Sequence, residues 1–326
     1  MQVTYRMNTI EDEDELVNFW SKYAGWDQID KAVWEHRFMN TPMGRSSVAL
    51  AIDDDSKKII GQFIFVPSKV SINGKEVSAF RPFAPVVNID MRNGDSLNAL
   101  QNLILEMYNL AAEDLKRKGA GLFYMVPDPR WIRAFKIFPF FQIAKFPLWS
   151  KNLPLENTYD IPEIYNVEEV EFGDPRMDKL WESASANYQG MVVRNNEILK
   201  WKVSHAKFYM KLICCQSEPV GFFAFARKDK QYLLADMITK DNEESLKVTL
   251  SAACNYAHTL FSSLSPEGQE KIQKIAVLAT PPIEAQAKEL GFFRDNYDFS
   301  LILHVLDEEL KVKGLTPEHW YASGND

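Results

Sequence analysis

The sequence predicts an α+β fold, an α/β sandwich in which mixed, mostly antiparallel sheets are flanked by helices. Apolar runs of strand length are interspersed with amphipathic helical segments along the whole chain. The order of these segments repeats once, and Gly61 and Gly221 lie in similar apolar strands. A tryptophan precedes each set of strands, Trp34 in the first half and Trp201 in the second. We therefore expect two copies of one structural plan.

The first half begins with helical patterns and continues with antiparallel strands. We expect helices over 11–23 and 33–38, and strands over 47–52, 59–66, 70–72 and 76–79. An aspartate-rich turn at 53–56 joins the first two strands. The dipeptide Asn73-Gly74 is a strong hairpin signal and joins the last two.

A strand, a turn and a long helix follow between residues 83 and 118. The apolar strand 83–89 stops before Arg92-Asn93-Gly94, and apolar residues then recur at helical spacing. Asp95 and Ser96 are helix-starting residues, and Gly119 supplies a C-terminal stop. Such a unit aims several backbone N–H groups at one point, an arrangement that suits a phosphate group.

The second half repeats this order after a loop-like linker over 152–166. A strand over 121–126, a short helix from 129 to 136 and a strand over 140–149 complete the first half. In the second half we expect helices over 178–187, 195–202, 243–260 and 283–290, and strands over 208–215, 220–227, 232–239, 275–280 and 299–305. We place the domains at 1–152 and 153–326. Long apolar edges invite aggregation, so we expect the closing strands 140–149 and 299–305 to meet in one shared core.

The composition excludes several classes of protein. The net charge of -8 argues against a general affinity for nucleic acid or for an anionic membrane surface. The 3 cysteines make neither a disulfide framework nor a metal-ligand spacing, and the 5 histidines share no metal spacing either. No apolar run approaches the roughly 20 residues of a membrane span. We expect a cytoplasmic protein without a nucleic-acid, membrane or metal partner, and its oligomeric state stays open.

Each half resembles the GNAT acyltransferase fold, in which helices and antiparallel strands lead to a strand–pyrophosphate loop–helix unit. The whole chain resembles tandem GNAT N-acetyltransferases, on the cues of Gly61, the early tryptophan and the C-terminal sequence 320–326. That ending is similar to the tails of acetyltransferases from bacterial polysaccharide loci. The resemblance implies transfer of an acetyl or other acyl group from coenzyme A to an amine of a small molecule or sugar. Residues 1–152 would hold acetyl-CoA or another acyl-CoA, and 153–326 would shape an acceptor cleft or be structural.

The resemblance also implies which residues bind the cofactor. The pantetheine arm would pair with the strand around Val87 and Ile89, and the pyrophosphate would meet the turn that follows. The turn residues are Arg92, Asn93, Gly94, Asp95, Ser96 and Leu97. The family has glycine or alanine where this chain has Asp95 and Leu97, which restricts how closely a pyrophosphate approaches. The matching turn of the second half, 240–244, has no glycine and three acids, so we expect no pyrophosphate there.

The catalytic residues are less well indicated. The tyrosine that commonly protonates the departing thiolate in this family is Phe135 here. Asp90 and Asp128 follow core strands, and we take them as the candidate bases for the acceptor amine. We interpret Tyr124 as a core aromatic and the histidines as structural.

Three functions stay open. The first is the acyl-CoA-dependent N-acyltransferase. The second is a binding or scaffold protein that kept the tandem fold and lost catalysis, which the altered loops favour. The third is an aminoacyl transferase of the Fem type, although no charged helical arm appears and the acidic balance does not favour tRNA.

Overall fold

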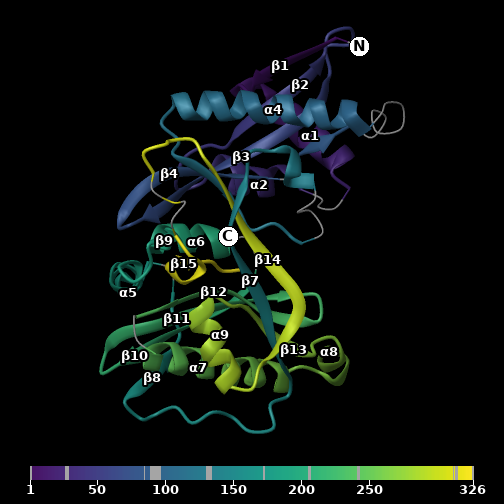
Figure 1. The fold of residues 1–326 in the computed structure, drawn as a ribbon. Helices are drawn as coiled ribbons and strands as arrows, with labels where there is room; N and C mark the ends of the chain where they lie inside the picture. The colour runs from purple at the N-terminus through teal and green to yellow at the C-terminus, as the bar shows by residue number, and fades with distance from the viewer. Residues whose placement is uncertain are drawn as a thin grey trace.

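The computed structural model describes residues 2–25, 29–83, 85–88, 97–129, 134–171, 173–204, 207–240, 243–310, 312 and 315–324. Within these ranges the strands join one 15-stranded sheet that runs through the whole molecule. Helices pack on its faces, and the two halves of the chain form the two ends of the molecule (Figure 1). The predicted α+β class, with mixed sheets flanked by helices, is confirmed.

The first half contains short helices, an antiparallel strand set and one long helix. Its helices are η1 (Ile10–Asp12), α1 (Glu13–Tyr23), α2 (Lys31–Trp34), the π-helix η2 (Glu35–Met39), α4 (Leu97–Arg117) and η3 (Ala134–Ile137). Its strands are β1 (Val3–Met7), β2 (Ser47–Asp53), β3 (Ile59–Ile72), β4 (Lys75–Pro82), β5 (Val86–Val87), β6 (Leu122–Met125) and β7 (Phe141–Asn152).

The second half also combines short helices, an antiparallel strand set and a long helix. Its helices are α5 (Pro175–Ser185), α6 (Asn196–Ser204), α7 (Glu243–Ser262), α8 (Pro266–Glu270), α9 (Pro281–Glu289) and η4 (Pro317–His319). Its strands are β8 (Tyr165–Glu168), β9 (Gly190–Val192), β10 (Phe208–Cys215), β11 (Glu218–Lys228), β12 (Gln231–Thr239), β13 (Lys274–Leu278), β14 (Phe293–Val305) and β15 (Trp320–Tyr321).

The two halves exchange their closing strands. The strand order is β1-β2-β3-β4-β6-β14-β7-β13-β12-β11-β10-β8, so β14 lies between β6 and β7 of the first half. β7 in turn pairs antiparallel with β13 of the second half, from Lys274↔Asn152 to Leu278↔Leu148. Figure 1 shows β7 and β14 side by side along the centre of the molecule. The expected meeting of the closing strands is confirmed, and each strand also completes the sheet of the other half.

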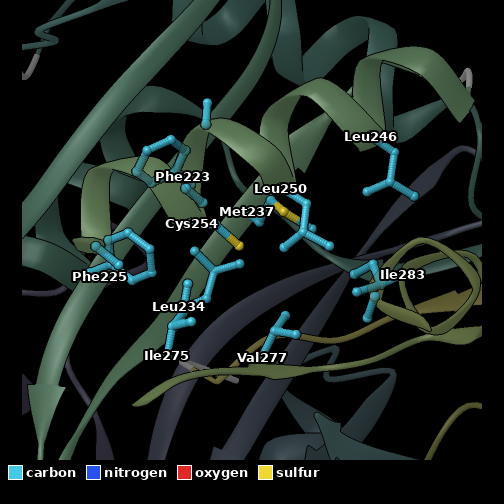
Figure 2. Close-up of a cluster of buried hydrophobic side chains, with 14 of the residues drawn as sticks. Phe223, Phe225, Leu234, Met237, Leu246, Leu250, Cys254, Ile275, Val277 and Ile283 are labelled. Atoms are coloured by element: carbon cyan, nitrogen blue, oxygen red, sulfur yellow. The ribbon is translucent and has the colours of Figure 1, made fainter. Parts of the chain in front are cut away.

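The long helix of each half lies close to a glycine of the neighbouring strand. A Cβ built on Gly61 would lie 3.0 Å from Cδ2 of Leu103 on α4. A Cβ on Gly221 would lie 1.9 Å from Oγ1 of Thr249 on α7. Both glycines therefore allow a helix to approach the sheet. Figure 2 shows the resulting core of the second half, where Leu250 and Cys254 meet Phe223 and other side chains of the sheet.

Several predicted boundaries were wrong. The strands expected over 59–66 and 70–72 form one strand, β3. Pro67 does not interrupt it, because β3 pairs with β2 only as far as Phe65 and a proline is tolerated at an edge without that neighbour. The strand expected over 76–79 continues to Pro82 as β4, and the strand expected over 83–89 begins only at Val86, as β5. Pro82 and Pro85 lack the N–H donors that a continuous ladder uses. The strand expected over 299–305 starts earlier, at Phe293.

Candidate functional site

Two neighbouring parallel strands of the first half separate partway along their length. β4 pairs in parallel with β6 at Ala79↔Leu122 and Phe80↔Phe123, and the pairing ends there. β5 continues the course of β4 but pairs with β3, through Gly61↔Val87 and Gln62↔Val86. We call the place where β5 and β6 part the first divergence. Among the described strands β5 pairs only with β3, so its other edge faces this opening.

A cavity of about 210 Å³ lies beside the first divergence, between the two halves. We call it the interlobe cavity. It is lined by residues from both halves, namely His36, Arg37, Pro42, Met43, Val66, Pro67, Ser68, Arg81, Phe83, Tyr124, Ile198, Trp201, Lys202 and Gly324. It opens on the sheet face opposite α4, because Phe80 and Phe123 pack with α4 whereas their neighbours Arg81 and Tyr124 line the cavity.

Tyr124 forms part of the cavity wall at the point where the strands part. Its side chain is buried, at 4% exposure, and its hydroxyl lies 2.9 Å from Oγ of Ser68 on β3. Either oxygen can donate in this hydrogen bond, so the pair can hold or pass a proton. Sequence reasoning assigned Tyr124 to the core. The structure shows a buried residue that also faces the cavity.

His36 and Trp201 hold the two halves together across the cavity. Nε1 of Trp201 donates to the carbonyl oxygen of His36 at 2.9 Å. Nε2 of His36 lies 3.2 Å from the carbonyl oxygen of Trp201. A carbonyl only accepts, so Nε2 of His36 is the donor in this hydrogen bond. His36 therefore belongs to the cavity wall, which the sequence analysis did not anticipate.

A second half-buried histidine, His304, lies away from the interlobe cavity. His304 on β14 has Nδ1 at 2.6 Å from the hydroxyl of Tyr108 on α4. Burial lowers the pKa of His304, with a smaller contribution from the charge of Lys116. Burial also raises the pKa of Tyr108. This hydrogen bond joins β14 to α4 in the core of the first half, so His304 has a structural role.

The second half contains a matching divergence. β12 and β13 pair in parallel up to Leu234↔Val277, after which β12 leaves β13 and continues to Thr239 beside β11. We call this place the second divergence. The C-terminal segment 320–324 packs there, since a Cβ built on Gly324 would lie 3.2 Å from Leu233 and 3.5 Å from Ala235. The preceding turn η4 contacts β7 and α9.

A buried ion pair fastens the C-terminal segment at the second divergence. Arg194 and Asp236 are both 0% exposed, and Nε of Arg194 donates to Oδ1 of Asp236 at 2.9 Å. Nη2 of Arg194 donates to Oγ of Ser323 at 3.0 Å, and the guanidinium lies 4.7 Å from the ring centroid of Tyr321. The hydroxyl of Tyr321 donates to the carbonyl oxygen of Met237. The segment is thus held by charge, hydrogen bonds and stacking together.

The structure describes only part of the predicted site. Val87 lies at the first divergence, and Leu97 is the first residue of α4. Asp128 is partly buried after β6 and is not among the residues that line the interlobe cavity. The other predicted residues lie outside the described ranges, namely Ile89, Asp90, Arg92, Asn93, Gly94, Asp95 and Ser96.

The described residues were compared with the requirements of a metal site and of a membrane-spanning helix, and they meet neither. They contain no group of three or more His, Cys, Asp or Glu side chains able to hold a metal ion. None of their helices is long and apolar enough to cross a membrane.

Comparison with solved structures identifies the fold. A GCN5-related N-acetyltransferase from Anabaena variabilis matches with a TM-score of 0.67 and 13% identity, over 94% of this chain and 73% of that one. The fold is that of the GCN5-related N-acetyltransferases. A second such enzyme, from Kribbella flavida, matches with a TM-score of 0.62 and 12% identity, over 94% of this chain and 72% of that one.

A lipid-transferring enzyme is also similar in structure. N-myristoyltransferase from Saccharomyces cerevisiae with bound myristoyl-CoA matches with a TM-score of 0.58 and 10% identity, over 92% of this chain and 82% of that one. No family model and no curated protein sequence matches the chain. At these identities the likeness concerns the fold, so function is argued from the site.

Proposed function

We propose that this protein is an N-acyltransferase built from two tandem GNAT-like units. Acyl-CoA binds at the first divergence, and an acceptor amine enters the interlobe cavity. One observation carries the proposal: a cavity of about 210 Å³, lined by residues of both halves, adjoins the first divergence. The C-terminal segment packs against the second divergence instead. The solved acyltransferases of the same fold support the reaction class.

The residues at the first divergence suit an acyl-CoA. The edge of β5 that faces away from β3 would lie beside an extended, amide-containing pantetheine arm, much as a strand edge takes an added strand. Val87 and Ile89 would pair with that arm. The turn from Arg92 to Leu97 precedes α4, and the start of a long helix favours the negative charge of a pyrophosphate. Acetyl-CoA is the acyl-CoA that we propose.

Two side chains of the interlobe cavity are suited to moving protons. Bound acyl-CoA would supply the acyl group as an activated thioester. Nδ1 of His36 can accept the proton that the acceptor amine loses, while the Trp201 carbonyl fixes the ring through Nε2. The hydroxyl of Tyr124, held by Ser68, can return a proton to the leaving sulfur. Asp90 and Asp128 stay as alternative bases.

The proposal also covers the role of the second half, the location of the protein and the kind of acceptor. The second half shapes the acceptor site through α6 and the C-terminal segment, and binds no acyl-CoA of its own. We propose a cytoplasmic location, in keeping with Cys214, Cys215 and Cys254, which are all free thiols. The acceptor is proposed to be a small-molecule amine, with no nucleic acid as partner.

Calorimetric titration with acetyl-CoA tests the proposal. We expect binding at one site per chain and a matching rise in the melting temperature, because a ligand of the folded state must stabilise it. Gly94→Val should weaken this binding about tenfold or more if the turn needs dihedrals that a β-branched residue avoids. Asn242→Val, in the matching turn of the second half, is the control and should leave the affinity unchanged.

Two outcomes would contradict the proposal. Absence of binding by acetyl-CoA and by longer acyl-CoAs would favour the scaffold protein without catalysis. Unchanged affinity in Gly94→Val would show that the loop assignment is wrong. Once binding is established, His36→Gln should lower kcat by about 10²-fold or more with little change in acyl-CoA affinity.

A further inference from the structure

Three hydrophobic clusters of the interior meet at the interlobe cavity. Val66 belongs to the cluster beneath α1 and α2 of the first half, and Phe83 packs against it. Ile198 belongs to the core cluster of the second half, and Met43 packs against that one. Tyr124 belongs to a third cluster, which includes side chains of β7 and β14. The apolar walls of the cavity are therefore continuous with the packed interior.

These walls are held in place by the packing behind them. Val66, Ile198 and Tyr124 are only 3%, 4% and 4% exposed. The ring of Phe83 lies 5.4 Å from the ring of Phe38, measured between their centroids. A preformed wall gives up little conformational freedom when a ligand binds, and most small-molecule sites are walled in this way by apolar and aromatic side chains.

The polar part of the lining offers little to a ligand with many hydroxyl groups. Arg37, Arg81 and Lys202 have interaction partners within the protein, so we assign them no contact with the acceptor. The hydroxyls of Ser68 and Tyr124 bind each other at 2.9 Å. Among the described residues, the lining contains no Asp, Glu, Asn or Gln, whose side chains accept the hydrogen bonds that sugar hydroxyls donate.

The size of the cavity limits the apolar body of a ligand to about one ring. An apolar cavity of about 150 Å³ in another protein holds one benzene molecule. The interlobe cavity measures about 210 Å³. The excess of about 60 Å³ equals the share of about two water molecules in the liquid, which leaves room for a short arm.

We infer that the acceptor is an amine on a short arm that carries one apolar ring, which binds among Met43, Phe83 and Ile198. This inference rests on the proposed acyl transfer for the word acceptor, whereas binding of such an amine is a property of the cavity alone. Three primary amines test it, namely 2-phenylethylamine, 2-cyclohexylethylamine and the polyhydroxylated glucamine. All three are protonated at neutral pH, so they differ in the body of the molecule and not in its charge.

Calorimetric titration of the full-length protein without acyl-CoA gives the first readout. We expect both ring amines to bind at least about tenfold more tightly than glucamine, because burial of the ring removes apolar surface from water. Comparison of the two ring amines with each other distinguishes an aromatic ring from a saturated one.

Two variants of the wall give the second readout. Met43→Gln places an amide in the apolar wall, and Phe83→Leu removes a ring from it. We expect each to reduce the preference for the ring amines about threefold or more while keeping a cooperative melt. Met210→Gln is the matched control, since Met210 is also half-buried but does not line the cavity, and it should retain the preference.

The outcomes separate this inference from the proposed function. Glucamine binding as tightly as the ring amines, or no binding by any of the three, would overturn the inference. An unchanged preference in both Met43→Gln and Phe83→Leu would show that the ring binds elsewhere, and would overturn it too. Titration with acetyl-CoA measures the proposed function independently. If the parent protein binds 2-phenylethylamine and no acyl-CoA, the proposed function fails and the ring site in the cavity stands.

Discussion

The two divergences have the same topology and different contents. In each half a strand runs parallel to its neighbour and then leaves it, after Phe80↔Phe123 in the first half and after Leu234↔Val277 in the second. A cavity adjoins the first, whereas the C-terminal segment and a buried ion pair lie at the second. The first divergence thus adjoins an open space, whereas the second is filled by side chains of the chain's own C-terminal segment.

The two divergences differ in how completely their polar side chains are fixed by packing. Atoms packed at the second divergence bury Arg194 and Asp236 completely, so that region has a fixed set of contacts. The first divergence is bordered by polar side chains that can rearrange their hydrogen bonds, such as Tyr124 with Ser68. Stability and ligand binding make opposite demands on a site, and under the proposed function they would fall in different halves.

The largest effect is expected from separating the halves. A fragment of residues 1–152 should be insoluble or show no cooperative melt, because β6 loses β14 and β7 loses both β13 and β14. Circular dichroism and light scattering on the purified fragment are the measurements. Co-expression with residues 153–326 is the control and should restore a soluble, cooperatively melting complex. A monomeric 1–152 fragment with its own sharp melt would show that the halves fold independently.

The next effect concerns the ion pair at the second divergence. Arg194→Met should lower the free energy of unfolding by about 3–5 kcal/mol, since it leaves the charge of Asp236 buried without its partner. Urea denaturation gives this value, and hydrogen exchange should show faster opening of residues 320–324. The double variant Arg194→Met with Asp236→Leu removes both charges and should recover most of the loss. A loss below about 1 kcal/mol in the single variant would mean that the pair does not hold the segment.

The two glycines beneath the long helices allow a matched comparison. Gly221→Ala should cost about 1–3 kcal/mol, because the new Cβ would overlap Oγ1 of the stiff, β-branched Thr249 at 1.9 Å. Gly61→Ala should cost less, since it meets the ends of Leu103 and Met107 side chains at 3.0 and 3.1 Å.

Thr249→Ala supplies the control for this comparison. It removes Oγ1 and Cγ2, which crowd the position of a Cβ on Gly221. Oγ1 of Thr249 has no hydrogen-bond partner to lose. Combined with Gly221→Ala it should recover part of the stability in a double-mutant cycle measured by urea denaturation. Equal costs at the two glycines would show that the helices do not differ in how closely they approach the sheet.

The smallest effect is a pH dependence at the exchanged strand. The pKa of His304 is lowered from 6.5 by burial, so the unfolded chain binds a proton more readily than the folded one. Stability should therefore fall as the pH drops through 6.5 and level off below the lowered pKa. His304→Asn can still accept from Tyr108, and should cost about 1 kcal/mol at most at neutral pH while removing this part of the pH dependence. Urea titrations over the range from about pH 8 to about pH 5 measure it; an unchanged slope in the variant would assign the dependence to other groups.

The regular parts of the fold were predictable because they depend on local chemistry. Asn73 and Gly74 both adopt positive φ, as the hairpin turn predicted there requires. Helix α4 ends at Arg117 just before Gly119, with φ of 88°, as the glycine stop predicted. The break between β4 and β5 was predicted before Phe83, whereas it lies between Pro82 and Val86, because the apolar run that begins at Phe83 hides the missing donor of Pro85.

The interlobe cavity was not predictable in the same way. His36 and Trp201 are 165 positions apart in sequence, and no motif near either residue predicts the hydrogen bonds that join them. Tyr124 alternates with Phe123 in a buried strand, and the sequence pattern alone does not tell which face borders a cavity. The residues Arg92 to Ser96 lie outside the described ranges, so their predicted role rests on the sequence.

The exchange of closing strands also bears on how the protein is made. Met125 of β6 pairs with Ile302 of β14, so the first half reaches its final sheet only after nearly the whole chain has left the ribosome. Until then β6 presents an apolar strand edge to its surroundings, where other nascent chains could pair with it. Translation speed and chaperone supply should therefore influence the yield of this protein more than its final stability does.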